Sequence, residues 1–115
     1  MKYAYMIERD KLLIKYVNKH YSELLEELKA ITSFEEFCQN KLINKAIKMD
    51  ILQIGENINH LSDKAKLQIN KKDLIGVIDF RNQVAHGYIS LKEDVIWKTI
   101  QEDLPRIMLQ INSIK

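Results

Sequence analysis

Apolar residues recur along the chain at intervals of three and four positions, which is the spacing of one face of an α-helix. The first series predicts a helix over about residues 7–29 and consists of Leu13, Val17, Tyr21, Leu24 and Leu28. His20 flanks this stripe, and we interpret it as a residue at the boundary of the core. The next helix is expected to begin at Phe34, because Ser33 and Glu36 form a capping-box pattern.

This second helical segment carries two apolar stripes. One consists of Cys38, Leu42, Ala46 and Met49. The other, offset by about 100° or more, consists of Ile43, Ile47, Ile51, Ile54, Ile58 and Leu61. Together they make about half of the circumference apolar, which is more than an outer helix of a monomeric bundle needs. We therefore expect a central helix, with one stripe packed on a second subunit in a homodimer.

Two more main helices follow a short helical turn over residues 62–66. The third should run from Lys72 or Asp73 to His86, and Gly76 within it would permit a close helix crossing. Glycine at this position lowers the helix propensity by about 1 kcal/mol relative to alanine.

The fourth helix is expected to open at a second capping box, formed by Ser90 and Glu93. Pro105 should kink or interrupt it, because proline lacks the backbone N–H that the helix uses. We interpret Trp97 as a packing residue rather than a platform for a nucleotide base. The whole pattern predicts an all-α, up-and-down bundle of four main helices in one domain, residues 1–115.

The composition agrees with a helical bundle and limits the classes of function. Of the 115 residues, 46% are apolar and 30% charged, with three glycines and one proline, which argues against a β-sandwich. The net charge is only +2, so a surface for RNA would need local positive charge or two copies of the chain. The single cysteine, Cys38, suits a reducing cytoplasm. Without a signal-peptide core or an apolar run near ~20 residues, we expect a soluble cytoplasmic protein without membrane contact.

Neither a metal nor a cofactor is expected from the sequence. It has no P-loop, Cys-x-x-Cys or His-Glu-x-x-His pattern. The three histidines are also too scattered to suggest a set of metal ligands.

Residues 81–88 combine a cation, an amide, an imidazole and a phenol at the end of the third predicted helix. Asn82 and His86 share a helix face, and Arg81 lies about 140° around the axis from His86. Gly87 is suited to end the helix. We expect Arg81, Asn82 and His86 to face one crevice, with Tyr88 just beyond. This would be an anion site with a titratable base, and phosphate is the obvious anion.

Glu56 has two interpretations, because it lies in line with the apolar Leu42 and Met49. A buried carboxylate must be paired, so it could accept hydrogen bonds from Arg81 or from a partner subunit. Alternatively it is a surface residue beside a kink at Gly55. The motif as a whole also has a purely structural interpretation, with Arg81 salt-bridged to Glu56 and a histidine stabilised by the helix dipole.

The pattern Arg-Asn-x-x-x-His-x-Tyr resembles the signature of the HepT-like family, a branch of the HEPN helical domains. Its four positions are Arg81, Asn82, His86 and Tyr88. The segments Ile54-Gly55-Glu56 and Val95-Ile96-Trp97 resemble two further patches of the family, so the likeness extends from Phe34 to Leu109. Members of this family are typically ribonuclease toxins paired with a minimal nucleotidyltransferase antitoxin, and they commonly form dimers with active sites at a shared cleft.

The resemblance implies a metal-independent endoribonuclease toxin of a type VII-like toxin–antitoxin pair. It assigns proton transfer to His86 and phosphate binding to Arg81, while Asn82 orients His86 or the substrate. These types suit the chemistry, since histidine can act as acid or base near neutral pH and arginine matches phosphate oxygens. The resemblance also makes Tyr88 the residue to which the partner transfers AMP, which inactivates the toxin.

Two other classes of function stay open at this stage. The chain could be a catalytically silent subunit that binds a nucleotidyltransferase, with the Arg81 and His86 crevice binding a nucleotide or nothing. It could also be a general dimeric scaffold, in which case both residues can be replaced without a phenotype. RNA cleavage by the isolated protein, and its dependence on Arg81 and His86, separates these classes from the ribonuclease.

Overall fold

The computed structural model describes residues 2–86 and 92–115, and every regular element within these ranges is helical. The predicted all-α fold is therefore confirmed. The elements are α1 (Lys2–Leu28), α2 (Phe34–Gln39), α3 (Lys41–Asn59), α4 (Asp63–Lys66), α5 (Lys71–Ala85), α6 (Glu93–Lys98), the π-helical segment η1 (Thr99–Asp103) and α7 (Leu104–Ile111).

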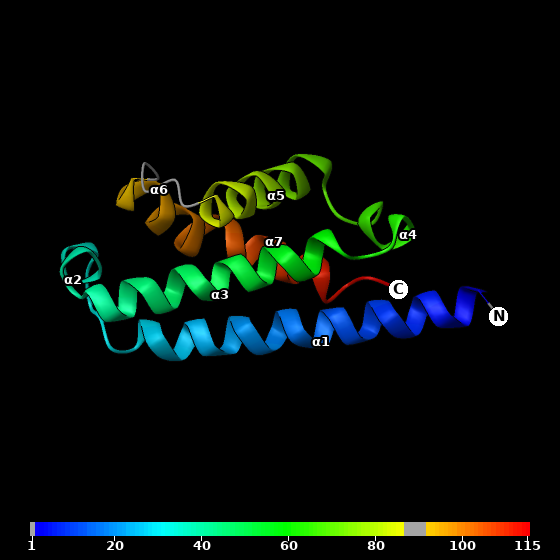
Figure 1. Ribbon diagram of the computed structural model, residues 1–115, viewed down its shortest axis with the longest axis horizontal. Coiled ribbons are helices and arrows are strands. Elements are labelled where there is room, and N and C mark those ends of the chain that lie inside the picture. The colour runs from blue at the N-terminus through cyan, green and yellow to red at the C-terminus, as the bar shows by residue number, and fades with distance from the viewer. Residues whose placement is uncertain (1, 87–91) are drawn as a thin grey trace.

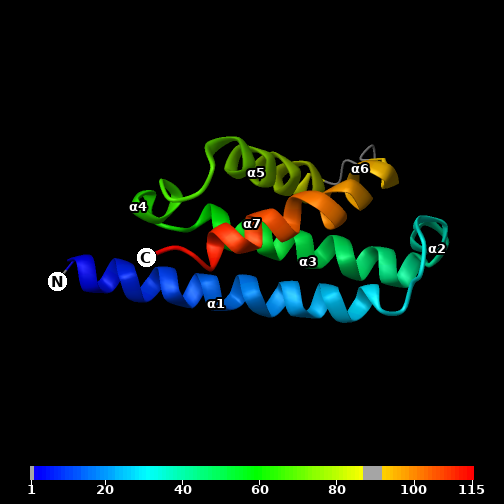
Figure 2. The same ribbon diagram turned by 180° about the vertical axis from the view of Figure 1, so that it is seen from behind.

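Helix α3 lies between α1 and α5 and packs against both of them (Figure 1). Helices α1 and α3 form a long antiparallel pair, and α7 lies behind α3 in Figure 1 and in front of it in the reversed view of Figure 2. Helices α2 and α6 contact each other at one end of the bundle, while α4 and both chain ends lie at the other. The central position predicted for the second helical segment is thus confirmed.

The core is built from the predicted stripes. Its fully buried side chains include Val17 and Leu24 of α1 and Ile47, Ile54 and Ile58 of α3. Burying one such side chain contributes about 1.5–3 kcal/mol, so the apolar stripe of α3 is a main source of stability. The other stripe of α3 has a different environment. Its members Leu42 and Met49 are 79% and 54% exposed, so none of the described helices covers them.

The helix expected to begin at Phe34 is interrupted at Asn40, which corrects the prediction of one continuous segment. Ser33 does cap α2, since its hydroxyl accepts from the Glu36 N–H over 3.2 Å. Asn40 then ends α2 and caps α3, and its side chain accepts from the Ile43 N–H over 3.1 Å. An asparagine satisfies the first N–H groups of a new helix, and this lets the chain change direction between α2 and α3.

Pro105 interrupts the last helix as predicted. It lies in the first turn of α7, and the five-residue π-helical segment η1 precedes it. Proline cannot donate the usual backbone hydrogen bond one turn back, and a π-turn is one way in which a helix accommodates such a gap. The buried stripe continues through this irregularity and includes Ile100, Leu104, Ile107 and Ile111.

Helix α6 begins at Glu93, with Lys92 at the N-cap and no side-chain capping bond. Ser90, the other half of the predicted capping box, lies outside the described residues. The carboxylate of Glu93 instead accepts from Asn44 over 2.5 Å and from Lys48 over 3.1 Å, which joins α6 to α3. Trp97 packs on Phe34 and Phe37, with ring centroids 6.0 and 5.3 Å apart, so its predicted packing role is confirmed.

In the described part of the chain, none of the helices combines the length and the apolar character that crossing a membrane requires.

Candidate functional site

The position of Arg81 depends on a glycine of the neighbouring helix. Gly55 of α3 is buried against α5, and a Cβ atom added to it would lie 2.7 Å from the Arg81 Cβ and 3.5 Å from the Val77 carbonyl oxygen. The first distance is shorter than real carbon contacts allow, so any larger residue would push α5 away from α3. The close helix crossing that was expected at Gly76 is therefore at Gly55. Around Gly76, no atom of another described element lies within 4 Å of the would-be Cβ, so the prediction for it is wrong.

Beside this crossing, Glu56 of α3 binds the guanidinium of Arg81. The Arg81 Nε–H donates to Glu56 Oε2 over 2.5 Å, and Nη2 pairs with the same oxygen. The two side chains are 33% and 24% exposed, so the pair is partly shielded from water. The structure therefore agrees with the interpretation in which Glu56 accepts hydrogen bonds from Arg81.

The second carboxylate oxygen of Glu56 is also occupied. His60 Nε2 lies 2.9 Å from Oε1, so Glu56 joins a histidine of its own helix to an arginine of α5. The hydrogen bond from His60, followed by that from Arg81, holds the pKa of Glu56 below its ordinary value. His60 is exposed as expected, but it is engaged with Glu56 rather than only solvated.

Asn82 lies between Arg81 and His86 and uses two different groups. Its side-chain Oδ1 accepts from Arg81 Nη1 over 2.9 Å, while its backbone carbonyl lies 2.7 Å from His86 Nδ1. A carbonyl can only accept, so Nδ1 carries a hydrogen and Nε2 of the neutral ring carries the lone pair. The amide of Asn82 therefore orients Arg81, whereas the contact with His86 would be available from any residue at position 82.

The guanidinium of Arg81 retains donors for a ligand. It has five N–H groups, and the contacts with Glu56 and Asn82 use one each on Nε, Nη1 and Nη2. Within the described residues this leaves one N–H on each terminal nitrogen. The remaining N–H groups of a guanidinium held in this way can donate to phosphate oxygens.

The structure brings together most of the site residues that the sequence predicted. Arg81, Asn82 and Glu56 form one hydrogen-bonded cluster, and His86, which is exposed at the C-terminal end of α5, joins it through the Asn82 backbone. We call these four residues the Arg81 cluster. Gly87 and Tyr88 lie outside the described residues, so the predictions for them stay predictions.

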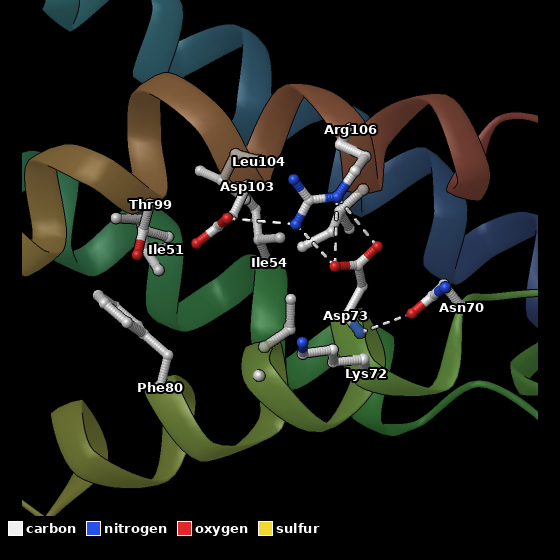
Figure 3. Close-up of a pocket in the computed structure, with 13 residues that line it drawn as sticks. Ile51, Ile54, Asn70, Lys72, Asp73, Phe80, Thr99, Asp103, Leu104 and Arg106 are labelled. Atoms are coloured by element: carbon white, nitrogen blue, oxygen red, sulfur yellow. Dashed lines mark hydrogen bonds and ion pairs between the residues drawn. The ribbon is translucent and has the colours of Figure 1, made fainter.

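A cavity lies on another side of α5. It has a volume of about 500 Å³ and is lined by α3, α5, η1 and α7, but not by Arg81 or His86. Asp73 and Arg106 both line it, and Figure 3 shows them joined by hydrogen bonds, which are 2.7–3.2 Å long. Arg106 holds the pKa of the Asp73 carboxyl below its ordinary value. This ion pair ties α5 to α7, and we interpret it as structural because the cavity lacks the motif residues.

Comparisons with known proteins agree with the motif. The family model described as "Ribonuclease HepT-like" matches residues 18–114. A protein of Caldanaerobacter subterraneus subsp. tengcongensis named "Putative RNase" is 24% identical over 101 residues, which are 88% of this chain and 89% of the relative. A "Probable ribonuclease HepT" of Thermococcus cleftensis is 27% identical over 85 residues, 74% of this chain and 77% of the relative. No solved structure matches. Since the family model covers most of the chain, this protein belongs to the HepT-like ribonuclease family.

Proposed function

We propose that this protein is a metal-independent endoribonuclease and the toxin of a type VII-like toxin–antitoxin pair. The observation that carries the proposal is the fixed guanidinium of Arg81, which Glu56 and Asn82 hold with one N–H left on each terminal nitrogen. A preorganised donor pair stabilises negative charge that develops on a phosphoryl group, because it needs no rearrangement during the reaction. The relatives named as ribonucleases support RNA as the substrate.

RNA supplies its own nucleophile, so the proposed reaction needs no cofactor. Nε2 of a neutral His86 takes the proton of the 2′-hydroxyl, the 2′-oxygen attacks the phosphorus and the bond to the 5′-oxygen breaks. The products are a 2′,3′-cyclic phosphate and a 5′-hydroxyl, which receives the second proton from an acid. In a homodimer the second His86, in its protonated form, can supply this proton. Arg81 holds the non-bridging phosphate oxygens throughout.

The exposed stripe of α3 supports the proposed homodimer. Leu42, Met49 and Glu56 follow one another at intervals of seven residues, so the uncovered apolar surface leads to the Arg81 cluster. A second copy packed on this stripe would bring two Arg81 clusters close to one cleft. Sedimentation of the parent as a dimer and of Leu42→Glu as a monomer would support this arrangement. Leu67→Glu, at an 85% exposed position after α4, is the matched control and should remain dimeric.

The regulatory part of the proposal concerns Tyr88 and a nucleotidyltransferase partner in the cytoplasm. Transfer of AMP to the Tyr88 hydroxyl would add negative charge and bulk next to the Arg81 cluster in the sequence, and RNA would be repelled. Tyr88→Phe should therefore stay toxic when the partner is co-expressed. Mass spectrometry that finds the AMP on another residue would contradict the assignment.

The direct test compares the parent with His86→Ala, by growth after induced expression at matched protein levels and by cleavage of RNA by the purified protein. Gln83→Ala, an exposed position on the same helix, is the control. Growth arrest and cleavage by the parent and the control, but not by His86→Ala, are the expected results. Equal cleavage by all three proteins would contradict the role of His86.

Two further measurements separate the proposed mechanism from metal-assisted hydrolysis. An oligonucleotide of the same sequence with 2′-deoxyribose should not be cut, and cleavage of RNA should persist in excess chelator. Cleavage of both oligonucleotides, or loss in chelator that added Mg²⁺ restores, would contradict the mechanism. If the parent neither cuts RNA nor arrests growth, the second candidate, a silent partner of a nucleotidyltransferase, gains support. The pairing of Arg81 with Glu56 is compatible with that candidate as well.

A further inference from the structure

A second polar cluster lies between α1 and α3, within an otherwise apolar helix interface. His20 and Glu23 come from α1 and Asp50 from α3, and the neighbouring residues Val17, Leu24, Ile47 and Ile51 belong to the core. His20 Nδ1 is 3.3 Å from Asp50 Oδ1 and 3.5 Å from Glu23 Oε2. We call these three residues the Asp50 cluster.

The Asp50 carboxylate is unusually placed for a charged group. The residue is 6% exposed, and its Oδ2 has no hydrogen-bond partner in the described part of the chain. A buried carboxylate oxygen without a donor is unfavourable by about 1–3 kcal/mol or more. Native structures therefore leave such an atom unpaired when a proton or an ion completes its surroundings.

No lysine or arginine of the described ranges forms an ion pair with Asp50, Glu23 or Glu27. Glu27, one turn beyond Glu23, brings a third carboxyl group against Asp50, and its Oε1 is likewise buried without a partner. Two ionised carboxylates have no hydrogen to share, so neither can satisfy the free oxygen of the other. Three carboxyl groups thus meet one imidazole, and the cluster lacks positive charge.

The distances fit a metal ion. Zn²⁺ binds histidine nitrogen and carboxylate oxygen at about 2.0–2.2 Å, so neighbouring ligand atoms of a tetrahedral site lie about 3.3–3.5 Å apart. The two distances from His20 Nδ1 match this edge, and one ligand atom from each residue lies within 4.8 Å of the others. Mixed nitrogen and oxygen donors favour Zn²⁺ or a similar first-row ion over Mg²⁺, which prefers oxygen alone.

We propose that His20, Glu23 and Asp50 form a structural site for a divalent first-row transition-metal ion, with Zn²⁺ the best fit, that ties α1 to α3. Solvent reaches it through Glu23, whose side chain is 48% exposed, and this gives the ion an entry path. The ion binds the folded chain and therefore stabilises it. The site lies at the contact of α3 with α1, whereas the Arg81 cluster lies at the contact with α5, so the ion takes no part in RNA cleavage.

The test uses tag-free protein stripped with chelator, titrated with Zn²⁺ by calorimetry and against a competing chelator. The parent should bind one ion per chain, and His20→Gln and Asp50→Asn should bind at least about 10-fold more weakly. His60→Gln is the matched control, because it removes another imidazole beside a glutamate but lies outside the Asp50 cluster. Glu23→Gln, at a half-exposed position, tests the site without risk to the core, and it too should weaken binding.

The thermal unfolding temperature supplies the second readout. Zn²⁺ should raise it for the parent and for His60→Gln and leave it nearly unchanged for Asp50→Asn. Co²⁺ in place of Zn²⁺ should give the visible absorption of a tetrahedral site in the parent and in His60→Gln, but not in Asp50→Asn. Equal Zn²⁺ affinity of the parent, His20→Gln and Glu23→Gln would overturn the proposal, as would a loss of binding confined to His60→Gln or a preference for Mg²⁺.

Discussion

Helix α3 presents a carboxylate to each of its two neighbours, and the surroundings of these carboxylates are opposite. Glu56 meets α5 and receives an arginine and a histidine, so that both of its oxygens are occupied. Asp50 meets α1 and faces one histidine among further carboxyl groups, so that one of its oxygens has no partner among the described residues. Asp50 is also the more deeply buried of the two, with a side chain 8% exposed against 33% for Glu56.

In the first cluster every carboxylate oxygen has a partner, whereas in the second cluster one carboxylate oxygen lacks a partner among the described residues. In the Arg81 cluster the protein supplies its own cation, and the cation still has donors for a phosphate. In the Asp50 cluster, no lysine or arginine of the described residues forms an ion pair with the carboxylates. Burial, followed by contact with Asp50 and its charge, raises the pKa of Glu27 to about 8. The first cluster is therefore ready for an anion, and the second for a cation.

The largest effect is expected when the fixed guanidinium is removed from the first cluster. Arg81→Ala should lower kcat/KM for RNA cleavage by about 10²–10³-fold, the usual loss for one preorganised donor group. Arg81→Lys should lower it too, because an ammonium keeps the charge but not the planar pair of donors. Steady-state cleavage of a labelled oligonucleotide measures both. Arg106→Lys, which alters the ion pair with Asp73 at the other side of α5, should cleave like the parent.

The next effect concerns the fit of α3 against α5, where two glycines predict opposite results. Gly55→Ala should lower the free energy of unfolding by about 1–3 kcal/mol, because its methyl group overlaps the Arg81 side chain. Gly76→Ala should raise it by about 0.5–1 kcal/mol, since it gains helix propensity in open space. Urea unfolding followed by circular dichroism gives both values. A neutral Gly55→Ala would show that Arg81 does not depend on this close contact.

Removing one charge from each cluster should also give results of opposite sign. In metal-free buffer at neutral pH, Asp50→Asn should stabilise the protein by about 1 kcal/mol, because it relieves a carboxylate surrounded by carboxyl groups. Glu56→Gln should destabilise it by about 1 kcal/mol, because it leaves Arg81 and His60 with a weaker acceptor. Thermal unfolding of the parent and of both variants measures the two changes in stability. Two shifts in the same direction would contradict the contrast between the clusters.

The smallest effect is the pH dependence that Glu56 introduces. Its pKa is lowered from the ordinary value of 4.5, so the folded state binds fewer protons than the unfolded state near that pH. The stability that Glu56 provides is therefore present above about pH 4.5 and is lost as the pH falls through the lowered pKa. The difference between the parent and Glu56→Gln, within about 1 kcal/mol for a partly exposed pair, should shrink over this range. Glu102→Gln, at an exposed position of η1, is the control, and a constant difference for Glu56→Gln would contradict the assignment.

Local patterns in the sequence predicted the helical part of this protein well. The buried stripes of α1, α3 and α7, the cap at Ser33 and the interruption before Pro105 all follow from interactions within a few residues. The cap at Asn40 was not predicted, because this residue lies within a continuous apolar pattern. Its side chain accepts from the first turn of α3, and α2 ends there. The residue types of the candidate site could also be predicted from the sequence, since Arg81, Asn82 and His86 lie in one short motif.

Contacts between helices were decided only by the tertiary structure. Glu56 and Arg81 are 25 positions apart, and the sequence left their pairing as one of two interpretations. His20 and Asp50 are 30 positions apart, and nothing in their local patterns indicated that they meet. Helical periodicity fixes which face a residue occupies, but the sliding and rotation of one helix against another fix its partner. The sequence therefore determined the helices and the chemistry of the motif, whereas packing around Gly55 and between α1 and α3 determined which charges are paired.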